Sequence, residues 1–540
     1  MNTKYPPLTK EQIHNFKKDL LEEMVYSLLQ NQQEMNQQLA LLTEQLNVMN
    51  QQRFGRHTEK SSQIEHQMEF CFNEAEVTFE DSTPDERIEP EITDIFPDQS
   101  ETAGEKKKRK PRQKGQRENN LKELPHQEIV YELKADERQC GCGGTYTELS
   151  TEKSTRLIFH PACFEVAEEI VHVYKCNKCG TIIRADHPMP LFEGSVATPS
   201  LLAGIMMAKY VNAMPFYRLE KTFADSGAMI SRQTMARWMI NAVDSYLIRI
   251  YERMKELLLE SRIIHADETT VEVSKDGRKA GAKSYMWVYV NENDDCPTVI
   301  YEYQKTRAAV HPRTFLADYK GILCCDGYEA YHTLNSEITV CGCWAHARRH
   351  FSNAVKALKN DKNRRGELTT SQQALKMIAD LFQQDKEWNQ LSPDERMNNR
   401  QTILQPKVNA FMSWLESKEG TIPPKSETGK GITYCINQRK YLLGFLATPD
   451  APLDNSEAER KIRNFVISRK NFIMIDTISG AEASAVLFSL AETAKANHLK
   501  PYNYFEYLLT ELPRYPEEFD IDDLLPWSKT LPAEIHKQEK

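Results

Sequence analysis

Apolar residues recur at every seventh position near the start of the chain. Leu21, Leu28, Met35 and Leu42 share one position of this repeat, and other apolar residues fill most of the second seam position. A heptad pattern kept over about four repeats is typical of a coiled coil. The pattern therefore predicts a zipper helix over 1–60 and a homodimer or higher oligomer. The alternative is an amphipathic helix packed against its own chain.

The next segment, 61–122, changes from strongly acidic to strongly basic. Its basic run contains Lys106, Lys107, Lys108, Arg109 and Lys110. A sequence this polar and charged predicts a disordered linker, and a basic run can condense on DNA phosphates. The formal net charge of the whole chain is -9, which argues against a simple nucleic-acid coat protein.

Two cysteine pairs, each followed by glycine, bracket a strand-rich stretch in the segment 123–195. They are Cys140 with Cys142 and Cys176 with Cys179. Four thiolates in two such knuckles are how a zinc ribbon binds Zn²⁺, so we expect a small zinc-ribbon-like domain. The single residue between the first two cysteines strains this geometry. Cys163 is an alternative ligand, and reduced, partly buried cysteines without zinc are the other interpretation.

A helical pattern over 196–255 contains two helices separated by a glycine-containing turn. The second helix is expected to begin after Ser231 as its cap and to present Arg232, Gln233 and Arg237. This is the pattern of a helix-turn-helix, whose second helix reaches base edges and phosphates of double-stranded DNA. Similar helix pairs without any DNA contact are common in helical proteins, which is the alternative.

Beyond position 256 the pattern changes to short apolar strands, two of which end on an acid. Asp267 and Asp326 close such runs, and a later helix carries Glu457 and Glu459. Carboxylates on adjacent strands and a neighbouring helix are suited to holding two Mg²⁺ or Mn²⁺ ions for phosphodiester cleavage. The helical period places Glu459 beside the apolar stripe and Glu457 toward solvent, so Glu459 is favoured. The alternative is that each acid is only a turn signal or a surface ion pair.

A large helical stretch interrupts this core at about 355–445, and a helical segment follows over 479–540. Just before the interruption, Cys343, His346, Arg348 and Arg349 form a compact cluster. Its spacing resembles a metal site, but a buried cysteine beside an aromatic residue explains it equally well. The two arginines suit contact with DNA phosphates.

The hydropathy of the chain also indicates where in the cell the protein is located. No window offers the roughly 18 uninterrupted apolar residues of a membrane helix, and the first residues lack the apolar stretch of a signal peptide. We therefore expect a cytoplasmic protein without membrane contact, associated with the bacterial nucleoid when bound to DNA.

The order of these motifs resembles the transposases of the insertion sequence sixty-six family (TnpC type) over nearly the whole chain. The similar segments lie at 53–60, 210–238, 265–269, 325–328, 342–349, 454–460, 468–472 and 485–507. The resemblance implies a DDE transposase with a ribonuclease-H-like core over 256–478, in which Asp267, Asp326 and Glu459 are the metal-binding catalytic acids. It also implies that Cys343 and His346 form a C-x-x-H signature. The chain departs from the family in its first cysteine pair and at Ser456.

Together these features predict a multidomain α+β protein. It is expected to bind the terminal repeats of a mobile element and target DNA, to cleave phosphodiester bonds and to transfer DNA strands. Accessory proteins of the same element are possible partners. Two alternatives remain open: another ribonuclease-H-like nuclease such as a junction resolvase, and a catalytically inactive DNA-binding regulator.

Overall fold

The structure is a computed structural model of a mixed α+β chain. It describes residues 25–27, 32, 35 and 126–537, apart from gaps at 135–136, 161–162, 280, 292–294, 359–367 and 517–518. Most of the predicted coiled coil, and the whole linker with Lys106–Lys110, lie outside the described residues. The chain divides into two compact units, one holding Val340–Asp454 and the other Asn73–Thr339 with Asn455–Lys540.

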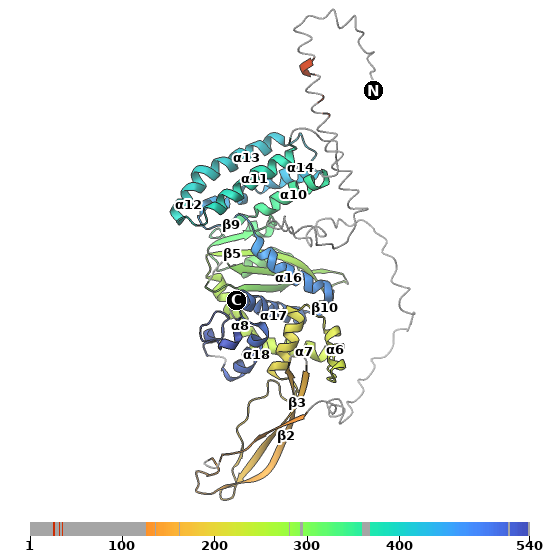
Figure 1. Ribbon diagram of the computed structural model, residues 1–540, viewed down its shortest axis with the longest axis vertical. Coiled ribbons are helices and arrows are strands. Elements are labelled where there is room, and N and C mark those ends of the chain that lie inside the picture. Colours follow the sequence, from red (N-terminus) through yellow and green to blue (C-terminus); the bar gives the residue numbers. More distant parts are fainter. Residues whose placement is uncertain are drawn as a thin grey trace, which may run out of the picture. The chain divides into compact units, whose positions relative to one another are not determined.

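A twisted sheet built on a long hairpin opens the larger unit. Its strands are β1 (His126–Tyr131), β2 (Tyr146–His160), β3 (Cys163–Cys176) and β4 (Ile182–Arg184). β3 is central, parallel to β1 and antiparallel to β2 and β4, and Figure 1 shows β2 and β3 running side by side along their length. Buried residues lie on both faces of β3, with Val166 on one face and Val171 and Val173 on the other, as expected for the central strand of this sheet.

Helices follow this sheet. They are α5 (Pro199–Met206), the π-helix η2 (Met207–Val211), α6 (Phe216–Asp225), α7 (Arg232–Ala242), the π-helix η3 (Val243–Leu247) and α8 (Ile248–Leu259). The Ser231 side chain accepts a hydrogen bond from Thr234 N, which confirms the predicted cap of α7. Gly227, at φ 86°, makes the turn between α6 and α7, a conformation that other residues rarely adopt.

The second sheet carries the predicted acids. Its strands are β5 (Ile263–Lys275), β6 (Lys283–Asn291), β7 (Val299–Gln304), β8 (Ile322–Cys325), β9 (Thr339–Gly342) and β10 (Met474–Thr477). In this unit the order is β7-β6-β5-β8, with β10 pairing the far end of β5. β5 is antiparallel to β6 and parallel to β8 and β10, so the sheet is mixed. The chain leaves the unit at β9, where Thr339 N donates to Gly321 O at 2.8 Å.

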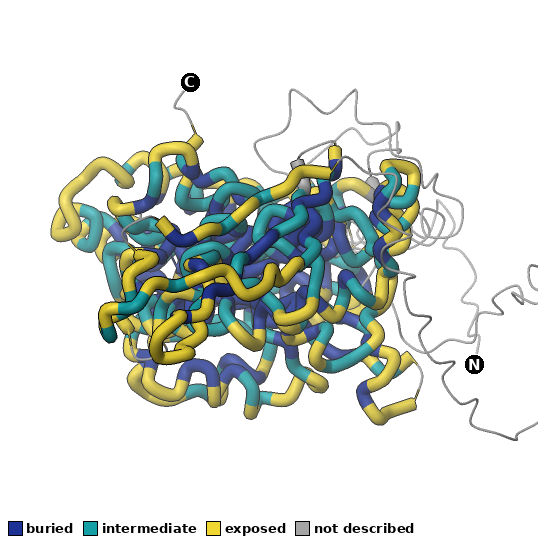
Figure 2. Tube along the Cα trace, turned by 90° about the horizontal axis from the view of Figure 1, so that it is seen from below, coloured by how far each residue is buried: buried dark blue, intermediate teal, exposed yellow. Residues whose placement is uncertain are grey.

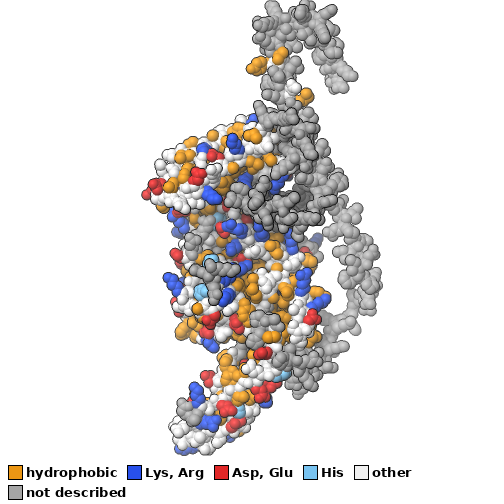
Figure 3. Space-filling view, viewed as in Figure 1, with side chains coloured by type: hydrophobic (Ala, Val, Ile, Leu, Met, Phe, Trp, Pro, Cys, Tyr) orange, Lys and Arg blue, Asp and Glu red, His pale blue; other side chains and the backbone are white. Residues whose placement is uncertain are grey.

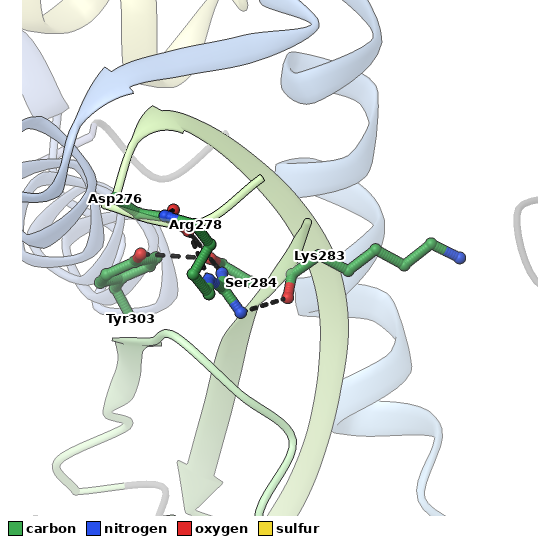
Figure 4. Close-up of polar contacts among 5 residues, drawn as sticks. All are labelled: Asp276, Arg278, Lys283, Ser284 and Tyr303. Carbon is green, nitrogen blue, oxygen red and sulfur yellow. Dashed lines mark hydrogen bonds and ion pairs between the residues drawn. The ribbon is translucent and has the colours of Figure 1, made fainter. Parts of the chain in front are cut away.

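One expectation about this sheet needs correction: β5 does not end at Asp267 but continues to Lys275. Over residues 270–273 partly buried residues alternate with buried ones, with Val271 and Val273 inside, and this period favours a half-buried strand. A polar network then closes the β5–β6 turn (Figure 4). Arg278 donates to Asp276 Oδ2 from Nε at 2.8 Å and to Ser284 Oγ from Nη2 at 2.5 Å.

Two helices cover the sheet (Figure 1). α16 (Ser456–Phe472) packs on β5 and β6, and α17 (Ile478–Ala496) packs on β7. Side chains of α17 accept hydrogen bonds from the backbone of the edge strand β7, as a neighbouring strand would. Val299 N donates to Thr493 Oγ1 at 3.0 Å, and Tyr301 N donates to Ser489 Oγ at 2.7 Å. These side chains satisfy backbone donors that would otherwise template edge-to-edge aggregation. Shorter helices α9 (Val310–Phe315) and α18 (Pro501–Glu511) complete the unit's main elements.

The other unit is helical. It contains α10 (Trp344–Leu358), α11 (Thr370–Glu387), α12 (Pro393–Asn399), the π-helix η5 (Arg400–Leu404), α13 (Gln405–Lys418), α14 (Glu427–Asn437) and α15 (Arg439–Leu442). Arg400 is fully buried and donates to Asp385 Oδ1 at 2.8 Å and to the Phe445 carbonyl at 2.8 Å, so its charge is paired inside the core. Figure 2 shows buried residues gathered inside the folded parts and exposed ones at the outer turns.

Candidate functional site

Asp267 lies in β5, and Asp326 directly follows β8, the parallel neighbour of β5. The register of β5 and β8 pairs His265 with Cys324, and each acid lies two residues farther along its strand direction. Neighbouring strands are about 4.8 Å apart, and paired residues of parallel strands point to the same side of the sheet. Asp267 is 7% exposed, so its carboxylate lies in a largely desolvated position.

Asn455 fixes the start of α16 against β5, one residue before Asp267. The buried Asn455 side chain donates from Nδ2 to the Ala266 carbonyl at 2.8 Å. Because a carbonyl can only accept, the amide oxygen faces His265 Nδ1, 3.0 Å away, and that ring nitrogen must carry the proton. Glu459 lies one helical turn farther on, where its N–H bonds to Asn455 O at 3.2 Å.

The two glutamates of this helix differ in their surroundings. The Glu457 side chain is 36% exposed and forms an ion pair with Arg460. The apolar stripe of α16 consists of Ala458, Ile462 and Phe465, and Glu459 is partly buried at its edge. The predicted orientation of Glu457 toward solvent agrees with this arrangement.

The structure adds a residue that sequence analysis did not single out, Glu268. Its side chain is 1% exposed, and it accepts hydrogen bonds from Arg307 Nε at 2.7 Å and from the Tyr331 hydroxyl at 2.7 Å. Burial, with a further contribution from the nearby charge of Asp326, raises the pKa of Glu268 to about 7. The sequence feature that could have identified Glu268 is its position two residues from the buried Ala266, on the same face of the strand. No sequence feature identifies Arg307.

The four predicted zinc ligands come together at one end of the β2–β3 hairpin. The sulfurs of Cys140, Cys142, Cys176 and Cys179 all lie within 4.8 Å of one another. Three of their separations are 3.4, 3.5 and 3.6 Å, close to the roughly 3.8 Å between ligands of a tetrahedral zinc with Zn–S bonds of about 2.3 Å. The set of four soft thiolates fits Zn²⁺, and the one-residue gap of the first pair does not prevent the grouping.

Local hydrogen bonds lower the pKa of Cys140 and Cys179 and raise that of Cys142. A backbone hydrogen bond at Cys142, with bonds from neighbouring side chains, lowers the pKa of Cys140 to about 6. At Gly144 a side chain would collide with Lys178 Cβ at 2.6 Å, so only glycine fits the first knuckle. Cys163 begins β3 and Cys176 ends it, roughly 40 Å apart at about 3.3 Å per residue, which excludes Cys163 as a substitute ligand.

The predicted DNA-contact residues of α7 are accessible. Arg232, Gln233 and Arg237 are exposed, while Met235 and Trp238 face the core. Tyr217 of α6 is 51% exposed and lies beneath two cations: Lys221 Nζ is 4.6 Å and the Arg232 guanidinium 5.9 Å from its ring centre. Elsewhere on the face seen in Figure 3, basic and acidic side chains are interspersed.

The cysteine–histidine cluster belongs to the helical unit. Cys343 is buried, and burial together with Arg349 and His350 lowers the pKa of His346 well below its usual value. Arg348 is half-buried near Phe382, and Arg349 is 7% exposed. A DNA phosphate could therefore reach Arg349 only after a local rearrangement.

Comparisons with known proteins identify the family of this chain. The family described as "Transposase IS66 family" matches residues 194–483, "IS66 C-terminal element" matches 489–527, and "Transposase C of IS166 homeodomain" matches 41–129. Two relatives from Sinorhizobium fredii carry the names uncharacterized protein y4qI and y4jD. The first is 27% identical and covers 91% of this chain and 89% of its own length; the second is 28% identical and covers 75% and 81%.

Among the described residues, every helix is too short or too polar to cross a membrane. The first family match alone spans more than half of the chain and contains Asp267, Asp326 and the helix that carries Glu459. The chain belongs to the IS66 family of insertion-sequence transposases.

Proposed function

We propose that this transposase cuts DNA at the ends of its insertion sequence and joins the freed 3′ ends to target DNA, using Asp267, Asp326 and Glu459. One observation carries the proposal. Each aspartate lies two residues beyond the pair His265–Cys324 of the β5–β8 register, and the Asn455 bond to Ala266 joins the start of α16 to β5. Two strands and a flanking helix that present three acids are the arrangement expected of a ribonuclease-H-like core.

The donor set fits hard divalent cations. Carboxylate oxygens are the preferred ligands of Mg²⁺ and Mn²⁺. Neighbouring buried carboxylates repel one another unless a cation or proton neutralises them. Burial is the main cause of the raised pKa of Glu268, and the charge of Asp326 adds to it. When bound, a metal pair supplies Lewis-acid activation of the attacking water or 3′-hydroxyl and stabilises the leaving oxygen. Asp267, Asp326 and Glu459 are the proposed ligands.

The remaining parts of the chain supply DNA capture and assembly. Arg232, Gln233 and Arg237 would contact DNA from the exposed face of α7, with the Lys106–Lys110 run adding sequence-independent attraction. Arg348 and Arg349 stay candidate phosphate contacts. The four-cysteine cluster would bind one structural zinc ion. The N-terminal zipper would pair two or more chains. The proposed domains are the six predicted segments, 1–60, 61–122, 123–195, 196–255, 256–478 and 479–540.

A cleavage and strand-transfer assay tests the catalytic proposal. The substrate is a duplex carrying the DNA that flanks the gene, with Mg²⁺, Mn²⁺ or chelator. Asp267→Asn, Asp326→Asn and Glu459→Gln should each abolish cleavage and leave DNA binding intact, because the amide keeps the shape but removes the charge that holds a hard cation. Glu457→Gln, on the same helical turn and paired with Arg460, is the matched control and should stay active.

The same assay separates the competing functions. A junction resolvase would cut branched duplexes and ignore the element ends, whereas an inactive regulator would bind the ends without cutting them. Inverted terminal repeats around the gene would favour transposition. If all four variants, including Asp326→Asn, cleaved at the wild-type rate, the two-metal mechanism would have to be abandoned.

A further inference from the structure

Arg307 is held rigidly beside the acids by contacts with the continuations of both acid-bearing strands. It lies in the loop after β7, and its Nε and Nη2 atoms approach Glu268 Oε1 at 2.7 and 2.5 Å. Its guanidinium carbon is 3.8 Å from the ring centre of Tyr328. Glu268 follows Asp267 in the sequence, and Tyr328 donates its backbone N–H to Asp326 Oδ1 at 2.9 Å.

The carboxylate that holds Arg307 is itself fixed. Its second oxygen, Oε2, accepts from the hydroxyl of Tyr331, which is fully buried. The Tyr328 hydroxyl also donates to the backbone carbonyl of Arg307, which ties the loop to the same residue whose ring supports the guanidinium. The position of the cation is therefore set by two elements, and its side chain loses little further freedom when a ligand binds.

One edge of this guanidinium remains available. Arg307 is 42% exposed at its side chain, and the described residues offer no partner to Nη1. An arginine has five N–H donors in a fixed fork, so donors remain after the Glu268 contact. A residue that only neutralised Glu268 would not need an open edge toward solvent at the rim of an acidic site. Phosphate oxygens are the acceptors that best fit such a fork.

We propose that Arg307 binds a backbone phosphate of the DNA through Nη1, next to the acids, with Glu268 and Tyr328 as the residues that position it. The inference rests on the proposed function, since it assumes that DNA enters at these acids. A fixed cation there would offset the repulsion between the DNA backbone and the carboxylates of Asp267, Asp326 and Glu459. It would also set which phosphate is presented for cutting.

Neutral-phosphate scanning tests this contact through binding. Duplexes of the flanking DNA, each with one methylphosphonate near the expected cleavage position, are titrated with protein in chelator, and affinity is read by fluorescence anisotropy. Wild type should lose about tenfold in affinity at one phosphate, the size of a lost charge-assisted contact. Arg307→Ala should bind unmodified DNA about tenfold more weakly and lose nothing further at that phosphate. For Arg307→Ala, the slope of the logarithm of the binding constant against the logarithm of the salt concentration should also fall in magnitude by about one.

Matched variants separate contact from general charge. Lys305→Ala removes an exposed cation two residues away and should keep the wild-type sensitivity at that phosphate. Arg307→Lys keeps the charge but cannot hold Glu268 and a phosphate with one fork, so it should recover only part of the affinity. In Glu268→Gln the loss of affinity should be spread over neighbouring methylphosphonate positions instead of falling at one. A purely structural role of Glu268 would not produce this effect.

The outcomes are distinct from those of the proposed function. If Arg307→Ala keeps the same phosphate-specific loss and salt slope as wild type, the contact is refuted, even if Asp326→Asn abolishes cleavage. If Asp326→Asn cleaves normally while Arg307→Ala loses the sensitivity, the catalytic proposal fails and the phosphate contact stands. Arg307→Gln repeats the measurement with less change in side-chain size, in case the alanine variant folds poorly.

Discussion

Replacing Asn455 with Asp should make the stability of the larger unit depend on pH. The wild-type amide donates to the Ala266 carbonyl and accepts from His265 Nδ1 in a fully buried position. An ionised carboxylate can only accept, so one of its oxygens would face the Ala266 oxygen across a distance that is 2.8 Å in wild type. Protonation restores the donor. The folded state of the variant therefore raises the pKa of this carboxyl.

The magnitude follows from that proton. An unfolded Asp has a pKa of about 3.9, and holding its proton at pH 7 costs about 1.4 kcal/mol per pH unit, or roughly 4 kcal/mol. This is an upper limit, because the protein can relax or admit water instead. Stability relative to wild type should be nearly unchanged at pH 4 and should fall as pH rises, until the raised pKa is passed. At about 2–4 °C per kcal/mol, the thermal midpoint at pH 7 should drop by up to about 15 °C.

Thermal and urea unfolding followed by circular dichroism at pH 4.5 and pH 7 would measure the effect. Asn398→Asp, at an exposed helical position, is the control and should show no such pH dependence. Asn455→Ala loses both hydrogen bonds without adding a titrating group, so it should destabilise by about 2–4 kcal/mol at either pH. A loss for Asn455→Asp that is equal at both pH values would refute the proton argument.

Three further predictions concern other parts of the chain. Cys179→Ser should reduce zinc per chain, measured by metal analysis after chelator-free purification, whereas Cys163→Ser should leave it unchanged. Burial lowers the pKa of Lys209 to about 8, so above pH 8 the unfolded state holds more protons than the folded state. Between pH 8 and pH 10 the wild type should therefore gain stability relative to Lys209→Met, by at most about 1.4 kcal/mol per pH unit, as measured by urea titration. Ser231→Ala should cost about 1 kcal/mol in the same assay and weaken DNA binding through fraying of α7; an unchanged midpoint would contradict the role of this cap.

The candidate acids stand out in the sequence because their signals are local. An apolar run that ends on an acid is visible in the sequence at Asp267 and Asp326, and the helical period distinguishes Glu459 from Glu457. The four cysteines were equally visible, since knuckle spacing is a local property. The cap at Ser231 is set by its own next turn, so it too followed from the sequence.

The supporting contacts could not be predicted, because they join residues far apart in the chain. Glu268 and Arg307 pair across 39 positions, and Asn455 bonds to Ala266 across 189. Neither partner carries a pattern that specifies the other. The extent of β5 was missed for a different reason: Asp267 looked like a strand end, while the alternation that continues the strand is polar on one face and so resembles a loop.

The helical unit interrupts the chain between the last strand aspartate and the helix that bears Glu459, and this has a consequence for how the protein folds. The two ends of the interruption, Thr339 and Asn455, return to neighbouring strands, so Val340–Asp454 is one closed loop of the larger unit. Closing a loop of this length instead of a 15-residue connection costs about 2 kcal/mol of chain entropy. An interruption that folds early would shorten the effective loop. We therefore expect α16 to join the sheet late, after the helical unit has formed, so that the full set of acids assembles only once most of the chain is folded.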